Sequence, residues 1–334
     1  MRAQAVGMLL SFMVLTLLVS RTYAVEYKLE IPLGLEEEAA YIPEDNPLTP
    51  EKIALGKQLY WDKRWSRNGT VACVSCHDPN HGWADPRQFS VTFEGNPTSR
   101  HAPTLINRVF SEQQQWAGVR TSLEDQAMKA RDQSPELLVK NLGAIPAYQE
   151  QFRKVFGTEL HAEGVAQAIA AYERTILSGN APYDRFKAGD QSALALSAQR
   201  GWALFTGKAR CEACHSGFNF TDEGYHNLGV GMDRENPDVG RYTVTQEEAD
   251  KGAFKTPTLR DVATRPPYMH DGSLKTLEEV VAFYSQGGHT NPWLAPEIKP
   301  LNLTASEQAD LVAFLAALTG EVSPEVSSPP QLPQ

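Results

Sequence analysis

Short runs of hydrophobic residues at helical spacing are separated along this chain by long polar loops. Near Thr49, a capping hydroxyl followed by Pro50 precedes an apolar face that includes Leu55, which predicts a helix start. Similar spacing predicts further helices over residues 123–142, 146–156, 162–177, 197–205, 277–284 and 306–318. The pattern therefore indicates a mainly α protein.

The predicted helices form two sets, and each set begins with a helix that leads into a Cys-x-x-Cys-His pentapeptide. The first copy is Cys73–His77, and it recurs 138 residues later as Cys211–His215. After each copy the chain becomes rich in loops, over residues 78–103 and 216–257. Long loops in a compact domain usually carry function or cover a cofactor. The repeated plan predicts two domains of one kind, both resembling cytochrome c.

The two pentapeptides have the residue types and spacing of covalent haem attachment. Two thiols separated by two residues can add across the vinyl groups of one haem, and the adjoining imidazole can then bind the iron. A zinc site would need further cysteines, which the chain lacks, and neither copy lies in the βαβ setting of a thioredoxin-like motif. We expect two haems c, held by Cys73, Cys76, His77, Cys211, Cys214 and His215.

The N-terminus and the composition suggest how the chain is divided. Residues 1–24 carry Arg2, an apolar stretch shorter than the roughly 20 residues that span a bilayer, and a small-x-Ala sequence ending at Ala24. This pattern predicts a secretory signal peptide. The expected segments are the signal peptide 1–24, an N-terminal domain 25–185, a C-terminal domain 186–322 and a disordered Pro- and Ser-rich tail 323–334.

Charge and export restrict the partners and the compartment. Without the signal peptide the chain carries 29 basic and 41 acidic side chains, a net charge of −12. This charge argues against nucleic acid and favours a basic electron donor. No later segment is long and apolar enough to span a membrane. We expect a bacterial periplasmic protein without a membrane span after signal removal.

From about residue 45 to 320 the sequence resembles the bacterial di-haem cytochrome c peroxidase and MauG family. Besides the two haem motifs, the matching stretches occur in the family's order. They are Arg100–Leu105, Gln115–Gly118, Leu123–Gln126, Gly240–Tyr242, Lys255–Val262 and Pro267–Gly272. The resemblance implies one haem in each of two cytochrome c-like domains.

The resemblance also implies different roles for the two haems. In the family the N-terminal haem binds peroxide, and the C-terminal haem stores or relays oxidising equivalents. The peroxidase branch places Met on the C-terminal iron, whereas the matching position here is Tyr284, as in the MauG/MbnH-like branch. A phenolate would stabilise ferric and high-valent iron more than a thioether would. Tyr284 is thus the implied second ligand of the C-terminal iron.

Other residues compete for that position. Helical periodicity alone would favour Tyr284 as a buried aromatic with a hydrogen-bonded hydroxyl, and the family position reverses that preference. The competing ligands are Met232, Met269, His226 and His270. Met269 and His270 stand inside the family's Pro-Tyr-Met-His segment, where structural or propionate contacts also explain them.

The loop after the first haem motif lacks the ligand that classical members of the peroxidase branch have there. Those members hold a His over the N-terminal haem and release it on reduction. Residues 82–100 contain no His, and His101 replaces the Asn of the family's Arg-Asn-x-Pro motif. We expect an open, five-coordinate N-terminal iron that accepts peroxide without prior reduction.

Peroxide cleavage needs a base to move a proton and a polar group to hold the leaving oxygen. The family supplies a Gln and, ten residues later, a Glu, which gapless extension from Trp116 places at Gln126 and Glu136. A second alignment contains a six-residue deletion that removes the acid. Asp132 would then be the nearest substitute, and Glu136 would begin a solvated helix.

Three further positions take their interpretation from the resemblance. Trp116 matches an inter-haem Trp that could carry an electron hole, with a core Trp as the alternative. Trp202 is a candidate for passing the hole to the surface. A calcium ion lies between the domains in the family, but His101 replaces its Asn ligand and Arg265 one carbonyl position, so calcium binding is doubtful here.

The implied activity is that of a di-haem peroxidase of the MauG-like kind. Hydrogen peroxide would generate high-valent haem iron, which would oxidise a Trp or Tyr side chain of a partner protein by long-range electron transfer. One alternative is peroxide detoxification with electrons from a small cytochrome c or a cupredoxin. Another is an electron-transfer protein without peroxide chemistry.

Overall fold

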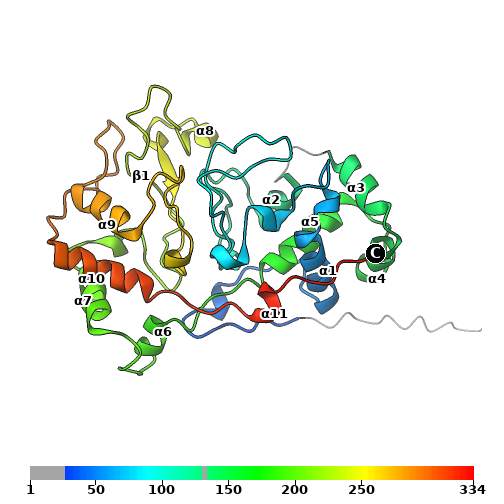
Figure 1. The fold of residues 1–334 in the computed structure, drawn as a ribbon, viewed down its shortest axis with the longest axis horizontal. Coiled ribbons are helices and arrows are strands. Elements are labelled where there is room, and N and C mark those ends of the chain that lie inside the picture. Colours follow the sequence, from blue (N-terminus) through cyan, green and yellow to red (C-terminus); the bar gives the residue numbers. More distant parts are fainter. Residues whose placement is uncertain (1–26, 130–133) are drawn as a thin grey trace, which may run out of the picture.

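The computed structural model describes residues 27–129 and 134–334 and is mainly helical (Figure 1). The predicted signal peptide and Asp132 lie outside the described residues. The helices are α1 (Pro50–Trp61), α2 (Leu123–Lys129), α3 (Pro135–Gly143), α4 (Pro146–Phe156), α5 (Ala162–Glu173), α6 (Pro182–Lys187), α7 (Leu196–Thr206), α8 (Tyr242–Thr245), α9 (Leu277–Gln286), α10 (Ala305–Ala316) and α11 (Pro324–Ser327). Strands β1 (Tyr225–Asn227) and β2 (Ala253–Lys255) pair antiparallel, with His226 opposite Phe254.

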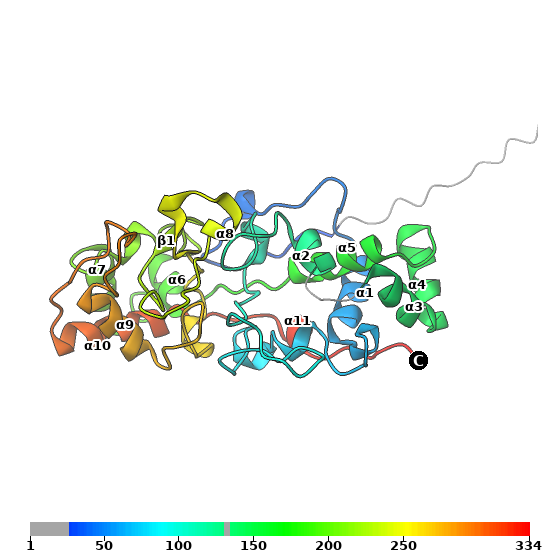
Figure 2. The ribbon, with the colours of Figure 1, turned by 90° about the horizontal axis from the view of Figure 1, so that it is seen from above.

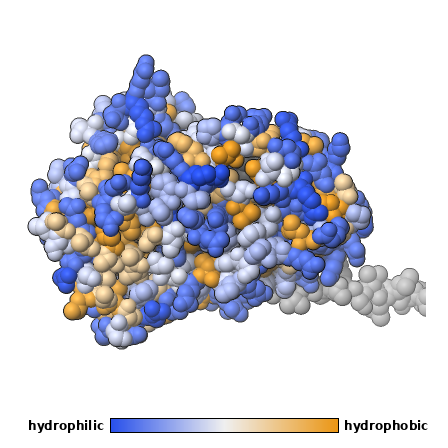
Figure 3. Space-filling model, viewed as in Figure 1, coloured by the Kyte–Doolittle hydropathy of each residue, from blue (hydrophilic) through white to orange (hydrophobic). Residues whose placement is uncertain are grey.

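Two helical groups lie at opposite ends of an elongated molecule (Figures 1 and 2). α1, α3, α4 and α5 form one end, around a core that includes Leu59 and Ile169. α7, α9 and α10 form the other end, around a core that includes Phe205 and Phe314. The viewed surface is largely hydrophilic, and hydrophobic residues gather most over the C-terminal half (Figure 3). Within the described residues, no helix is long and apolar enough to cross a membrane.

Each half is built on a pair of closely crossing helices, α1 with α5 and α7 with α10. In each pair a glycine lies where the two helices cross, Gly56 on α1 and Gly201 on α7. A Cβ added to Gly56 would lie 1.8 Å from the carbonyl oxygen of Ala168, and one added to Gly201 would lie 1.9 Å from that of Asp310. The two backbones can approach this closely only where no side chain intervenes. The same arrangement in both halves is the structural counterpart of the repeated sequence plan.

Replacing Gly201 by Ala should therefore destabilise the protein by about 1–3 kcal/mol, because the new methyl group must push α10 away from α7. Gly143→Ala is the matched control, since a Cβ at this helical glycine meets nothing within 4 Å. The control should be neutral or slightly stabilising. Denaturant unfolding of the two holoprotein variants checks both expectations. Equal stability of the two variants would contradict the tight crossing.

Two predicted helices differ in extent from their hydrophobic pattern. The stretch 162–177 is helical only to Glu173, because Asn107 forms hydrogen bonds with the residues that follow. The backbone N–H of Asn107 donates to the carbonyl of Ile176, and the side-chain oxygen of Asn107 accepts from the N–H of Ser178 at 2.9 Å. The stretch 123–142 forms two helices, α2 and α3, with Ser134 capping the second by accepting a hydrogen bond from Leu137 N–H.

The C-terminal tail is ordered, which differs from the disorder that its composition suggested. Residues 323–334 include α11 and run back along the N-terminal half (Figure 1). The carbonyl of Val326 accepts a hydrogen bond from Tyr172 Oη at 2.8 Å, and Val322 and Val326 pack against the core of that half. A few apolar residues and backbone carbonyls are enough to hold a Pro-rich segment that has a ready-made surface to cover.

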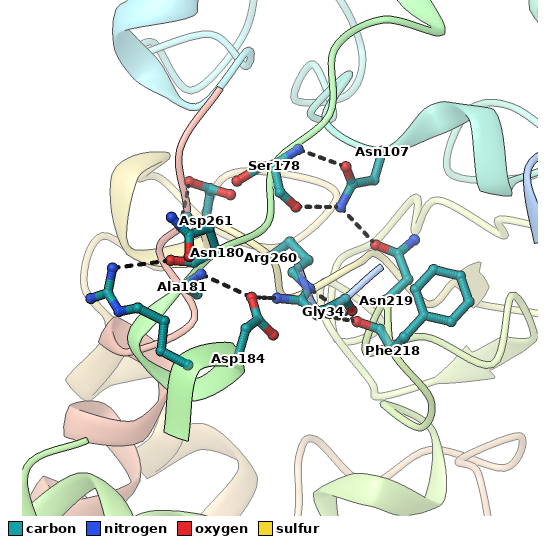
Figure 4. Close-up of polar contacts among 12 residues, drawn as sticks. Gly34, Asn107, Ser178, Asn180, Ala181, Asp184, Phe218, Asn219, Arg260 and Asp261 are labelled. Atoms are coloured by element: carbon teal, nitrogen blue, oxygen red, sulfur yellow. Dashed lines mark hydrogen bonds and ion pairs between the residues drawn. The ribbon is translucent and has the colours of Figure 1, made fainter. Parts of the chain in front are cut away.

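The segment between the halves is fixed by a buried ion pair (Figure 4). Arg260 from the C-terminal half reaches Asp184 of α6, with Nη1 2.6 Å from Oδ2. The same guanidinium donates to the carbonyl oxygens of Gly34 and Phe218 at 2.8 and 2.6 Å. Arg260 therefore holds three segments together: the N-terminal segment at Gly34, helix α6 at Asp184, and the loop after the second haem motif at Phe218.

Candidate haem sites

The first pentapeptide begins a 3-10 turn, Cys73–Ser75, at the wall of a cavity of about 470 Å³. Cys73, Cys76 and His77 all line this cavity. His77 Nδ1 lies 3.3 Å from the carbonyl oxygen of Trp83, so Nδ1 carries the proton and Nε2 is left to bind iron. Burial lowers the pKa of His77 to about 4, which keeps the imidazole neutral, as a metal ligand must be.

The second pentapeptide repeats this geometry in the other half. Cys211, Cys214 and His215 line a separate cavity of about 210 Å³. His215 Nδ1 lies 3.0 Å from the carbonyl oxygen of Phe220, and burial lowers the pKa of His215. Each imidazole is thus oriented by a backbone carbonyl that follows its own motif. Both sets of residues fit a covalently attached haem with a proximal His.

Tyr284 lies on α9 and lines the second cavity. Burial, with the neighbouring Cys211 and Cys214 adding to it, raises the pKa of this phenol. Within the described residues no group hydrogen-bonds its hydroxyl, and the side chain is only partly buried because it faces the cavity. The hydroxyl is therefore not engaged by the protein in the way that the alternative of a structural, hydrogen-bonded tyrosine requires. A ferric ion would supply the positive charge that a buried phenolate needs.

The competing ligands of the second haem differ in how they are engaged. His270 stacks on Phe254 at a ring distance of 3.6 Å, and His226 Nε2 lies 2.8 Å from Asp222. Met269 lines the second cavity, whereas Met232 is not among its lining residues in the described part of the chain. His226 and His270 line this cavity too, and no hydrogen bond engages the ring nitrogens of His270 in the described chain, so Met269 and His270 both remain rivals of Tyr284.

In the first cavity, Gln126 on α2 is held by Gln115, whose Nε2 donates to Gln126 Oε1 at 2.9 Å. This bond uses the amide oxygen of Gln126 and leaves its NH2 group to donate into the cavity. Among the described lining residues there is no Met, and His101 is the one His besides His77. His101 directs Nδ1 to the carbonyls of Arg87 and Gln88, both at 3.2 Å. The wall is consistent with an open iron.

The structure does not bring Glu136 into the described wall of the first cavity. Its side chain is exposed at the start of α3, where the helix N-terminus and Ser134 lower its pKa. This is the position expected for a solvated helix start. The structure thus leaves the catalytic role predicted for Glu136 without support from geometry.

Trp116 lines both cavities. Its indole N–H donates to the carbonyl of His101 at 2.8 Å, and its own carbonyl accepts from Lys255 N–H at 2.7 Å. The ring is therefore fixed in the wall that the two sites share. Trp202, on α7, is not among the described residues that line the second cavity. Lys187 Nζ lies 4.7 Å from its ring centre and disfavours positive charge on the indole.

Two cations, the buried Lys255 and the partly buried Arg108, lie in the same walls, and neither was expected to serve the site. Lys255 lines both cavities, and its Nζ lies 2.6 Å from Glu223. Arg108 lines the first cavity and donates from Nε to Gln114 Oε1 at 2.8 Å. Such cations could neutralise haem propionates. Lys255 opens the matching stretch Lys255–Val262, which was the available signal for it.

The side chains at the family's calcium position are poor donors for this ion. Calcium takes six to eight oxygen ligands in proteins. The His101 side chain offers nitrogen, and Arg265 places a buried guanidinium at this position, bonded to the carbonyls of Thr258 and Arg260. These residues do not fit a calcium ion.

Comparison with known proteins agrees with this geometry. A family model described as "Di-haem cytochrome c peroxidase" matches residues 50–192. The chain is 44% identical over 301 residues to the methylamine utilization protein MauG of Methylorubrum extorquens, covering 87% of this chain and 84% of that protein. It is 40% identical over 329 residues to cytochrome-c peroxidase IdrP1 of Denitromonas iodatirespirans, covering 87% of each.

A solved structure agrees as well. The crystal structure of a MauG-like protein associated with microbial copper homeostasis matches with a TM-score of 0.83 at 30% identity, covering 91% of this chain and 99% of that one. Two cytochrome c-like halves with one haem motif each define the class of di-haem c-type peroxidases. The chain belongs to the di-haem cytochrome c peroxidase and MauG family, and it is a peroxidase that acts on hydrogen peroxide.

Proposed function

We propose that this protein is a MauG-like periplasmic peroxidase that oxidises a Trp or Tyr side chain of a partner protein. The observation that carries the proposal is the Tyr284 phenol, which lines the second haem cavity without a protein hydrogen-bond partner in the described chain. A phenolate ligand favours oxidised iron, which suits a site that withdraws electrons from a difficult substrate. The 44% identity to a MauG protein supports this branch.

The two covalently held haems would supply the peroxide-cleaving and the charge-storing iron. His77 and His215 would orient them through the carbonyls that fix their tautomers. Gln126 would donate its NH2 group to peroxide in the first cavity, in a pose fixed by Gln115. Trp116 would connect the two sites from a ring held by the His101 carbonyl. We assign residues 25–185 and 186–322 to the two haem domains.

The test is to add one equivalent of hydrogen peroxide to the fully ferric holoprotein without any reductant. Immediate peroxide consumption, followed by covalent oxidation of Trp or Tyr in an added polypeptide, seen by mass spectrometry, is the expected result. Reduced small cytochrome c is the competing donor. A reaction that needs prior reduction and consumes only the cytochrome would overturn the proposal in favour of peroxide detoxification, which the name of IdrP1 supports.

Replacing Gln126 by Ala should slow the reaction with peroxide about a hundredfold, the usual cost of removing one well-placed hydrogen-bond donor. Stopped-flow mixing of ferric holoprotein with peroxide measures this rate. Gln58→Ala is the matched control, because the Gln58 amide lies on α1 and donates to the tail at Gln331. The control should react like the wild type. A wild-type rate in Gln126→Ala would remove this residue from the peroxide site.

Replacing the exposed Glu136 by Gln should leave that rate unchanged, because its carboxylate does not reach the described wall of the cavity. The same stopped-flow experiment decides this point. A large loss of rate would show that the start of α3 turns into the cavity when haem is bound.

A further inference from the structure

Arg265 lies at the junction between the two haem-bearing halves. It lines the second cavity and is buried. On its other side it contacts Gly82, which follows the first haem motif. A Cβ added to Gly82 would lie 2.5 Å from Thr264 Oγ1 and 3.0 Å from Arg265 Cβ. The loop that carries Arg265 therefore packs directly on the loop of the first haem.

The guanidinium of Arg265 is directed at backbone oxygens of its own loop. Nη1 donates to the carbonyl of Arg260, and Nη2 donates to that of Thr258. Burial lowers the pKa of Arg265 to about 10, while the carboxylate of Asp261 acts in the opposite direction. The side chain is thus a charged group at neutral pH. Its bonds are charge-assisted, which makes them stronger than neutral ones.

A metal cation at this junction would need oxygen ligands, which calcium takes in proteins. Two carbonyl groups are occupied by the N–H groups of Arg265. His101, which lines both cavities, points its protonated Nδ1 at other carbonyls and offers no side-chain oxygen. A divalent ion would also be repelled by the fixed guanidinium.

We propose that the Arg265 guanidinium is a built-in cation that takes the place of calcium between the haems, so that their communication through Trp116 needs no bound metal. The fixed charge also stabilises the reduced form of the second haem, because a nearby positive charge favours the less positive iron. This inference goes beyond the proposed function, since it holds whether the electrons come from a protein side chain or from a cytochrome.

The first test measures metal in the holoprotein as purified and after treatment with a calcium chelator and desalting. We expect no stoichiometric calcium, and electron paramagnetic resonance signals and haem potentials that chelation leaves unchanged. One calcium ion per chain, whose removal alters the low-spin signal or uncouples the haems, would overturn the proposal. Neither readout depends on the identity of the substrate.

The second test changes the charge. Arg265→Met should shift the potential of the second haem downward, while Arg265→Lys, which keeps the charge, should stay close to the wild type. The double variant Arg265→Thr with His101→Asn supplies oxygen donors and removes the guanidinium, so it should gain about one calcium per chain. A Met variant with the wild-type potential would overturn the electrostatic role. If that variant does not fold, the Lys variant and the metal analysis still decide the question.

Discussion

Replacing Tyr284 by Met should raise the reduction potential of the second haem by on the order of a few hundred millivolts, within the roughly 0.8 V that axial ligands span. The phenol lines the cavity of that haem, and a neutral thioether would remove the negative charge that favours ferric iron. The variant should also lose the oxidation of protein side chains while keeping its reaction with peroxide. Potentiometric titration and the polypeptide assay measure the two effects.

Two further variants separate ligation from packing. Tyr284→Phe removes the ligand without supplying another. The low-spin signal of the second haem in electron paramagnetic resonance should therefore be replaced by a high-spin signal. Tyr268→Phe is the matched control, because Tyr268 lines the same cavity. The control should keep the wild-type spectrum. If Tyr284→Phe also keeps it, Tyr284 is not a ligand, and Met269 and His270 become the candidates.

The sequence predicted the parts of this site that depend on local spacing. A Cys-x-x-Cys-His run fixes its own geometry within five residues, and the two cysteines and the histidine of each run line one cavity. Tyr284 and Gln126 were assigned through family positions, and each lies on a short helix beside its cavity. Residues in a matching stretch, or on a helix that follows one closely, could therefore be given a position.

Features that depend on distant contacts were harder to predict. The position of Glu136 followed from gapless counting from Trp116, but the structure begins a new helix near Glu136 and exposes its side chain. The Pro-rich tail looked disordered because composition does not reveal that Val326 and its carbonyl have a partner surface in the other half. The buried state of Arg265 is set by loop packing against Gly82, which no local pattern records.

Replacing Asp184 by Ala should lower the free energy of unfolding by about 3–5 kcal/mol, the usual cost of leaving one partner of a buried ion pair uncompensated. Arg260 would keep its carbonyl partners in Gly34 and Phe218 but lose its counter-charge (Figure 4). Denaturant unfolding of the holoprotein, followed by circular dichroism, measures the loss. Lys208→Met, which breaks only a surface ion pair with Glu307, is the control and should change little.

The same variant tests whether this ion pair also serves the chemistry. Arg260 provides the carbonyl that Arg265 holds, and it ties the second haem loop to the connecting helix α6. Loss of Asp184 should therefore loosen the relative position of the two haems as well as the fold. Electron sharing between the haems should slow in Asp184→Ala under conditions where the protein remains folded. Unchanged electron sharing would confine Asp184 to stability and leave Trp116 and Arg265 as the groups that couple the two sites.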